Sequence, residues 1–208
     1  YTNITHELRT PLTLILGPLE DMQKETSLPA KQAQKLSVIH QSALRLLNLI
    51  NQILEFRKTE TQNKKLCVSK GNIAPLIYEI GLKYKELNQK TKIDFQIQIE
   101  KEEMLLFFDK EIITIVLDNL ISNAIKYTEQ GRVTLSLYQT MRNEVAYTEI
   151  KVSDTGYGIS AEALPHIFDR YYQESGKHQA SGTGIGLALV KNLVTLHEGE
   201  IRAESMQN

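Results

Sequence analysis

The sequence predicts an α+β protein in two parts, a helical hairpin followed by a domain in which strands and helices alternate. Up to about residue 60, apolar residues recur three and four positions apart, which is the spacing of an amphipathic helix. Beyond residue 65, several short runs alternate apolar and polar residues, as strands with one buried face do. Helical stretches separate these runs, which is typical of a mixed domain.

The first part is expected to contain two helices. The apolar stripe of the first helix consists of Leu8, Leu12, Ile15, Leu16, Leu19 and Met22. A break follows at residues 26–29, and Pro29 suits the first position of the second helix. The second stripe consists of Leu36, Ile39, Ala43, Leu46, Leu47, Ile50, Ile53, Leu54 and Phe56. Because two helices of this length bury too little surface to be stable alone, we expect two copies to form a dimeric four-helix bundle.

In the second part, three strands are expected around Phe95, around Val133 and from Val145 to Val152. Helices are expected near residues 73–88, 110–128 and 184–197. No internal repeat or low-complexity segment is visible in the sequence. The second part is therefore expected to be an α+β or α/β domain.

Composition excludes several classes of function. The 24 basic and 25 acidic side chains give a net charge of -1, which offers no electrostatic reason to bind nucleic acid. Cys67 is the single cysteine, so one chain forms no disulfide, and a reducing compartment fits best. No apolar run reaches the roughly 18 residues that a membrane-spanning helix needs. Because the sequence starts at Tyr1, we expect it to be a piece of a longer protein.

A polar stripe lies on the otherwise apolar helix expected at 110–128. It consists of Asn119, Asn123, Lys126 and Tyr127, at spacings of four, three and one. A buried amide needs a hydrogen-bond partner, and a magnesium-bound triphosphate supplies one, because amide oxygens ligate Mg²⁺ and a lysine meets phosphate. The alternative is a polar helix edge at the surface.

Two glycine-containing segments follow. Asp154 ends a strand in the pattern Asp-x-Gly-x-Gly, with Gly156 and Gly158, where a carboxylate can accept a hydrogen bond from an exocyclic amino group. An ordinary glycine turn is the alternative. Residues 182–187 (GTGIGL) precede a helix, and such a loop offers backbone N–H groups to an anion. This loop matches neither a P-loop nor a dinucleotide fingerprint.

The three motifs in this order resemble the catalytic core of the sensor histidine kinases of two-component systems. Residues 5–12 (THELRTPL) look like the phosphoacceptor box, and residues 167–171 (IFDRY) look like the phenylalanine box before the ATP lid. The resemblance covers nearly the whole chain. It implies a dimerization and histidine-phosphotransfer hairpin at residues 1–62, and at 63–208 an ATP-binding α/β sandwich of the type shared with gyrase, Hsp90 and MutL.

The resemblance also implies a reaction. His6 would take the γ-phosphate of ATP, with Glu7 as the base, and then pass it to an aspartate of a response-regulator receiver domain. Thr10 lies one turn after His6, and by resemblance its hydroxyl would position water when the protein dephosphorylates its partner. Residues 14–19 (LILGPL) look most like hybrid sensors, which carry the receiver on the same polypeptide. The resemblance further implies the cytoplasmic portion of a membrane-anchored bacterial sensor.

The resemblance assigns roles in the nucleotide site. Asn123 would ligate Mg²⁺ with the help of Asn119, Lys126 would meet a phosphate, and Tyr127 would flank the base or ribose. Asp154 would accept from the adenine amino group, with glycines backing the ring. The residues expected to back the ring or to shape the end of the lid are Gly156, Gly158, Gly182, Thr183, Gly184 and Gly186.

The chain departs from the family pattern in two places. Many relatives carry an arginine two residues after Tyr171, where this chain has Gln173, so Arg170 and Lys177 are the candidates for the γ-phosphate contact. The alternative is that Arg170 lies on a helix surface and that Lys177 is a solvated loop residue. After residue 205 the family usually has another glycine box and a closing strand, so we expect the last strand of the domain to be missing from this sequence.

Two other functions fit the second domain. Relatives of this fold also hydrolyse ATP, which needs a base to activate water. In gyrase-like enzymes a glutamate stands four residues before the magnesium asparagine, but this chain has Asn119 there, and an amide takes no proton at neutral pH. A kinase is therefore favoured over an ATPase. The remaining alternative is a scaffold, or a phosphatase-biased sensor, that binds ATP without using it; intact His6, Glu7 and Asn123 argue against it.

Overall fold

The computed structural model describes residues 2–24, 28–60, 65–88, 92–173 and 183–206. For residues 2–9, 24 and 60 the backbone alone is described. The chain divides into two compact units, residues 1–63 and 64–208. The expected helical hairpin lies in the first unit, and the expected mixed domain lies in the second. None of the described helices is long and apolar enough to cross a membrane.

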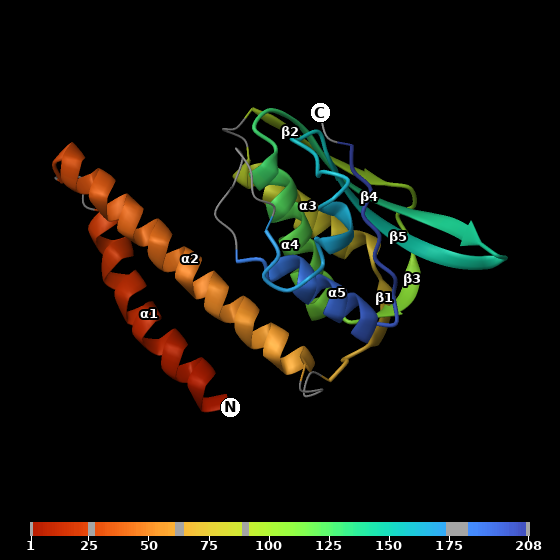
Figure 1. Cartoon of the computed structure of the whole chain (residues 1–208), viewed down its shortest axis with the longest axis horizontal. Coiled ribbons are helices and arrows are strands. Elements are labelled where there is room, and N and C mark those ends of the chain that lie inside the picture. The colour runs from red at the N-terminus through yellow and green to blue at the C-terminus, as the bar shows by residue number, and fades with distance from the viewer. Residues whose placement is uncertain (1, 25–27, 61–64, 89–91, 174–182, 207–208) are drawn as a thin grey trace. The chain divides into compact units, whose positions relative to one another are not determined.

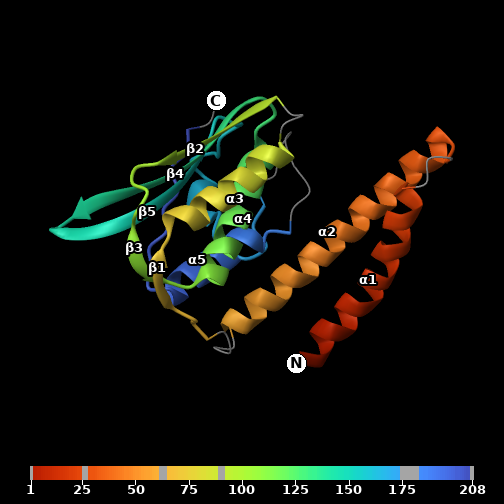
Figure 2. The ribbon, with the colours of Figure 1, turned by 180° about the vertical axis from the view of Figure 1, so that it is seen from behind.

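The first unit consists of α1 (Thr2–Lys24) and α2 (Ala30–Glu60), which lie side by side (Figure 1 and Figure 2). The helices join through a small core in which Leu12 and Leu16 of α1 meet Ala43 of α2. α1 continues through two internal prolines. The prediction that Pro29 is the first residue of α2 is wrong by one position, because α2 begins at Ala30. Pro29 directly precedes the helix, and its carbonyl accepts from the N–H of Ala33 at 3.0 Å.

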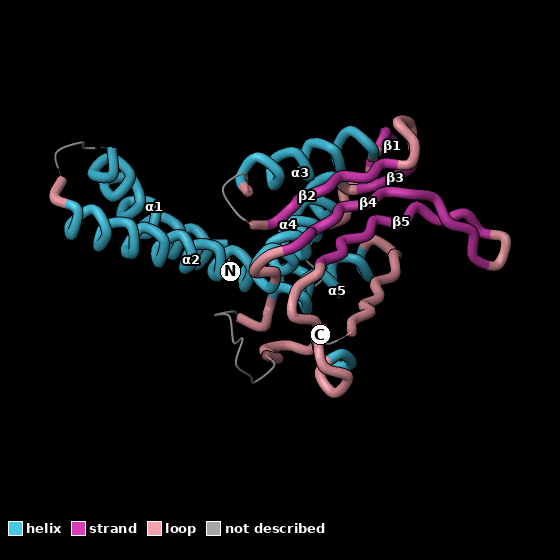
Figure 3. The backbone as a smooth tube through the Cα atoms, turned by 90° about the horizontal axis from the view of Figure 1, so that it is seen from above, coloured by secondary structure: helices cyan, strands magenta, loops and turns pink. Residues whose placement is uncertain are grey.

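The second unit is built on a three-stranded sheet in the order β2 (Ile93–Ile99), β4 (Gly131–Arg142), β5 (Val145–Asp154). β2 and β4 are parallel, and β4 and β5 are antiparallel. β2 pairs only with the first half of β4, so the β4–β5 hairpin continues past the end of β2 (Figure 3). A separate antiparallel pair joins β1 (Ser69–Asn72) and β3 (Leu105–Phe108).

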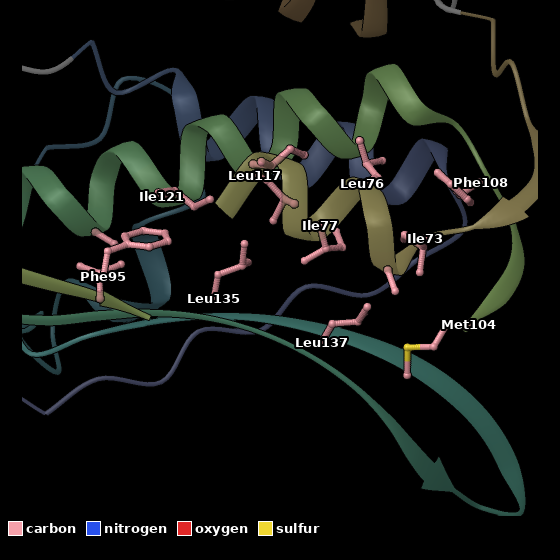
Figure 4. Packing of buried hydrophobic residues seen from close by; sticks show 14 residues of the cluster. Ile73, Leu76, Ile77, Phe95, Met104, Phe108, Leu117, Ile121, Leu135 and Leu137 are labelled. Carbon is pink, nitrogen blue, oxygen red and sulfur yellow. The ribbon is translucent and has the colours of Figure 1, made fainter. Parts of the chain in front are cut away.

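The helices of the second unit are α3 (Ala74–Leu87), α4 (Lys110–Tyr127) and α5 (Gly186–Leu196), with a short 3-10 helix, η1, at Leu164–His166. α3 and α4 cover one face of the sheet, and the apolar core lies between the two layers (Figure 4). Ile77 of α3, Ile121 of α4 and Leu135 of β4 are each 0% exposed. The three predicted helices are confirmed within two residues at each end.

The sequence did not predict β1 and β3. β1 has the sequence SKGN, which carries no apolar alternation, and β3 has LLFF, a continuous apolar run without a period. Both strands have four residues, and each is a strand because it pairs with the other, for example at Gly71 and Leu106. Such a pairing depends on residues more than 30 positions apart, which no local pattern records.

Candidate functional site

Hydrogen bonds of Asp109 hold the start of α4, the helix that carries the polar stripe. At the start, Asp109 is 3% exposed, caps the helix by accepting from the N–H of Ile112 at 3.1 Å, and also accepts from the N–H of Cys67 at 2.7 Å. The Asp109 N–H donates to Nε2 of His197, just after α5, at 3.0 Å. These bonds fix where α4 lies, and therefore where its asparagines lie.

The two asparagines differ in their surroundings. Asn119 is 9% exposed, and its Nδ2 donates to the carbonyl of Ile115 on the same helix at 2.8 Å. The helix backbone therefore satisfies the N–H group of this buried amide, and the predicted role of Asn119 at a nucleotide stays a prediction. Asn123 is half-buried, and within the described residues its side chain makes no hydrogen bond. Its oxygen is thus available to a hard cation.

Lys126 and Tyr127 contact each other at the end of α4. The Lys126 Nζ lies 4.7 Å from the centroid of the Tyr127 ring and donates to its Oη at 3.2 Å. A cation over an aromatic face is stabilised by the ring quadrupole. Both side chains are exposed, so a phosphate or a ribose approaching this end of α4 can reach them.

The Asp-x-Gly-x-Gly segment lies directly against the end of α4. A Cβ on Gly156 would be 2.3 Å from the Tyr127 carbonyl oxygen, a distance that no side chain tolerates. Asp154 is the last residue of β5, and its Oδ1 accepts from the Gly156 N–H at 2.9 Å. Its other oxygen, Oδ2, makes no hydrogen bond within the described part of the chain and suits an exocyclic amino group. Gly158 follows with a φ of 72°.

The described part of the glycine loop, from Thr183, contacts the segment that resembles the phenylalanine box. The N–H of Tyr171 donates to the Gly184 carbonyl at 2.8 Å, and a Cβ on Gly184 would be 2.6 Å from the Tyr171 backbone. Gly184 has a φ of 66°, which favours glycine. Tyr171 also has a positive φ, 61°, and its side chain is 71% exposed. The backbone of this segment is therefore set by its contact with the glycine loop.

The glycine loop leads into α5, whose start suits an anion. Thr183 Oγ1 accepts from the N–H of Ile185 at 3.3 Å, and α5 begins at Gly186. Ile185, at the N-cap, has no side-chain oxygen for the first N–H groups of the helix. Those groups and the helix dipole favour a phosphate.

The structure brings part of the predicted site together. The end of α4 meets the Asp154 segment, and Gly184 meets Tyr171, while Arg170 is exposed beside Tyr171. Gly182 and Lys177 lie outside the described residues. In the hairpin, the backbones of His6 and Glu7 belong to α1 but their side chains are not described, and Thr10 is exposed on α1.

His197 has a role that its sequence position does not indicate. Like His40, His166 and His178, it has no neighbours that mark a site, and the sequence predicts all four to be surface or capping residues. His197 does follow the last turn of α5, but its Nε2 also accepts the N–H of Asp109, 88 residues away. A helix-end histidine carries no local signal of such a bond. The His166 ring lies 2.9 Å from Asp169, on the surface, and His178 lies outside the described residues.

Two other features lie apart from the predicted site. A groove of about 640 Å³ runs over the polar side chains of the three-stranded sheet, such as Gln96, Thr134 and Lys151, and includes none of the predicted site residues. Within the described ranges, no three His, Cys, Asp or Glu side chains form a metal cluster. A cation at the predicted site would therefore depend on the Asn123 oxygen and on oxygens of the nucleotide.

Comparison with known families matches both parts of the chain. Residues 2–62 match the His Kinase A (phospho-acceptor) domain, and residues 108–208 match the Histidine kinase-, DNA gyrase B-, and HSP90-like ATPase. The crystal structure of full-length ShkA in complex with AMPPNP has the same fold, with a TM-score of 0.74. The two sequences are 24% identical, and the match covers 98% of this chain and 43% of the ShkA chain.

Two curated relatives resemble nearly all of the chain. It is 38% identical to Histidine kinase P4 of Formosa agariphila and 33% identical to Hybrid signal transduction histidine kinase D of Dictyostelium discoideum, each over 97% of this chain. The chain spans only 15% and 13% of the lengths of these relatives. The chain belongs to the histidine kinase family and carries its catalytic core, a phosphoacceptor domain followed by an ATP-binding domain.

Proposed function

We propose that the chain is the core of a sensor histidine kinase that transfers the γ-phosphate of ATP to His6 and then to an aspartate of a response-regulator receiver domain. One observation carries the proposal: a single chain joins a phosphoacceptor domain, which contains His6, to an ATP-binding domain. The domains are taken as residues 1–62 and 63–208.

ATP and Mg²⁺ fit the residues of the proposed nucleotide site. The Asn123 oxygen makes no hydrogen bond in the described structure and would hold the cation, with Asn119 beside it on the same helix. Lys126 would bind a phosphate, Tyr127 would flank the base or ribose, and Asp154 would accept from the adenine amino group. When bound, Mg²⁺ neutralises phosphate charge. Thr183, Gly184 and Gly186 would hold phosphate through their backbones, and Arg170 is the proposed γ-phosphate contact.

The carboxylates of α4 favour transfer over hydrolysis. Only Glu111 and Asp118 on this helix could act as bases, and Glu111 lies in its first turn. Asp118 accepts from Tyr84 Oη at 2.8 Å and from Lys83 Nζ at 3.1 Å, so its carboxylate is hydrogen-bonded to two side chains of α3. Asn119, an amide, takes no proton. Without a base for water on α4, the γ-phosphate requires a nucleophile from elsewhere in the protein.

In the proposed reaction, a ring nitrogen of His6 attacks the γ-phosphorus and the bond to the bridging oxygen breaks, so that ADP leaves. Glu7 accepts the imidazole proton. The phosphoryl group then passes from His6 to an aspartate carboxylate of the receiver domain, which regenerates the imidazole. Thr10 would position the water that removes phosphate from the regulator, which gives the same core a phosphatase activity.

A homodimer is part of the proposal. Ile39, Leu46 and Ile53 of α2 are spaced seven residues apart and are 51%, 49% and 39% exposed. A seven-residue apolar repeat is typical of a helix that packs against other helices in a bundle. A second copy would bury this stripe in a four-helix bundle.

The receiver domain and the location of the protein are proposed on the family alone. The hybrid relative suggests that a receiver on the same longer polypeptide is one possible partner. Because ATP is the substrate, we propose that the core faces the cytoplasm, as part of a membrane-anchored sensor. We propose no nucleic-acid partner, in keeping with the net charge of -1.

The test is autophosphorylation with radiolabelled Mg-ATP. The parent protein is compared with His6→Gln and with the matched control His40→Gln, which replaces the other histidine of the hairpin. We expect an acid-labile, alkali-stable label in the parent and the control, and none in His6→Gln. A label that persists in His6→Gln overturns the assignment of His6. Binding of Mg-ADP without any label in the parent supports the scaffold alternative.

A further inference from the structure

Two turns of the second unit lie against each other beside the proposed nucleotide site. The first turn, residues 128–132, runs from the end of α4 into the first two residues of β4, and the second, residues 154–157, begins at the last residue of β5. The Tyr157 N–H donates to the Tyr127 carbonyl at 3.3 Å. The neighbouring Gly156 lies so close to the same carbonyl that a side chain there would collide with it. The first turn follows the residues proposed to bind metal and phosphate, and the second contains the residue proposed to bind the base.

Two hydrogen bonds, one of them between backbone groups, join Arg132 and Thr155 on the far side of the same two turns. The N–H of Thr155 donates to the Arg132 carbonyl at 3.0 Å, and the N–H of Arg132 donates to Thr155 Oγ1 at 2.9 Å. The backbone bond continues the pairing of β4 with β5, and both bonds hold the strand ends rather than the end of α4. The end of α4 is joined to the second turn through Tyr127 and through the residues that follow it.

One contact between the turns consists of two side chains. Tyr157 Oη donates to Oε2 of Glu129 at 2.9 Å. The hydrogen bond to the Glu129 carboxylate raises the pKa of Tyr157, because ionisation of the hydroxyl would remove the donor. Glu129 lies two residues after the last residue of α4, and Tyr157 lies three residues after Asp154. The bond therefore spans the gap between the two halves of the proposed site.

We propose that Tyr157 and Glu129 are a pair of positioning residues that hold Asp154 at a fixed distance from the asparagine and lysine of α4. This inference rests on the proposed function and adds two residues to its site. A nucleotide bound with its base at Asp154 and its phosphates at α4 contacts both turns at once. Its affinity and its reactivity then depend on the spacing of the turns, because small displacements of binding groups are costly.

The chain contains a matched control for this bond. On β4 and β5, Tyr138 Oη donates to Glu149 Oε1, which is again a tyrosine bound to a carboxylate. The hydrogen bond to Glu149 raises the pKa of Tyr138 as well. This second pair joins neighbouring strands and touches neither turn. Loss of its hydroxyl should therefore leave the spacing of Asp154 and α4 unchanged.

The test measures the affinity of Mg-ADP by calorimetry, at a temperature where thermal denaturation has found every variant folded. Tyr157→Phe and Glu129→Ala should each weaken binding about five-fold, the loss expected for one hydrogen bond. Glu129→Gln retains an acceptor oxygen and should bind nearly as the parent does. The double variant should lose no more than either single variant, because both remove the same bond. Tyr138→Phe should bind as the parent does.

Each other result overturns the inference. Parent-like affinity in Tyr157→Phe means that the bond does not position the site. Equal losses in Tyr157→Phe and Tyr138→Phe, or additive losses in the double variant, mean that a general change in the domain is responsible. Failure of Glu129→Gln to restore binding removes the hydrogen bond as the cause. If the parent itself binds no Mg-ADP, the proposed nucleotide site fails, and the inference fails with it.

Discussion

The two units of the chain bury their apolar residues very differently. In the second unit, residues from α3, α4 and the sheet meet in a large core, and Ile77, Ile121 and Leu135 are 0% exposed. In the first unit, the core between the helices is formed by Leu12, Leu16 and Ala43, while Leu46 is 49% exposed on α2. A two-layer domain encloses its own core, whereas the two helices of a hairpin bury only the faces that contact each other.

This difference separates what each unit requires in order to be stable. The second unit has a sheet covered by helices and needs no further layer on that face. The first unit leaves a regular apolar stripe uncovered, which is typical of a surface that associates. The comparison predicts that substitutions in the second unit act on unfolding, and that substitutions on the α2 stripe act on association.

The largest effect is expected from Leu135→Ala in the core of the second unit. Removing a fully buried leucine side chain costs about 2 to 5 kcal/mol in the free energy of unfolding, because buried contacts are lost and a cavity remains. Chemical denaturation of the parent and the variant measures the loss. Leu87→Ala, at a position 72% exposed, is the matched control and should change stability little. Similar losses at both positions would contradict the core described for this unit.

The next effect is expected from Leu46→Glu on the exposed stripe of α2. An unpaired charge inside a bundle costs about 3 kcal/mol, which corresponds to roughly a hundred-fold weaker dimer. Analytical ultracentrifugation measures the dimer dissociation constant. Leu44→Glu is the matched control, because Leu44 lies two residues earlier and so about 160° away around the helix. A dimer that tolerates Leu46→Glu but not Leu44→Glu would place the interface on the other flank.

A smaller effect is expected from Asp109→Ala, which removes the N-cap of α4 and the acceptor for the Cys67 N–H. Loss of a cap costs about 1 to 2 kcal/mol. The Cys67 N–H lies on an exposed residue, so water can replace its acceptor and it adds little to this loss. Thermal denaturation measures this loss of stability. Asp94→Ala is the control, since Asp94 is an exposed partner of Arg132 and such pairs contribute little. Equal stability of the two variants would show that Asp109 does not organise the start of α4.

The smallest effect is expected from Tyr84→Phe in α3. Burial and the hydrogen bond to Asp118 raise the pKa of Tyr84 above its ordinary value of 10.0. The neutral hydroxyl therefore stabilises the fold, fully below pH 10 and progressively less as the pH rises above 10. The variant should lose about 1 kcal/mol at pH 7.

The pH dependence supplies the sharper measurement for Tyr84. Denaturation between pH 8 and 11 should show a stability that falls less steeply above pH 10 in Tyr84→Phe than in the parent. Tyr78→Phe, which alters an exposed tyrosine of the same helix, should follow the parent. If the free energy of unfolding fell equally with pH in the parent and in Tyr84→Phe, Tyr84 would not be the cause of the loss of stability above pH 10. The described part of the hairpin contains no tyrosine, so this dependence belongs to the second unit.

Much of the fold could be predicted from periodicity, but the site only in part. The spacing of apolar residues predicted α3, α4 and α5, because a one-sided core imposes that spacing on each helix. It did not predict β1, whose four residues become a strand only by pairing with β3. In the site, the stripe on α4 was visible in sequence, yet the N–H of Asn119 is satisfied by its own helix. An amide that bonds within its own helix differs from one that is available to a ligand in its position in the fold, which the spacing of residues does not reveal.

The sequence by itself determined the order of the elements, the division into a helical part and a mixed part, and the motifs that identify the family. These features are local, because each depends on which residues recur within one helix, strand or loop. The tertiary structure alone decided which polar groups meet across the fold. It pairs His197 with Asp109 and Tyr157 with Glu129, 88 and 28 residues apart. A hydrogen bond needs atoms about 3 Å apart, and the packing of whole elements sets that distance.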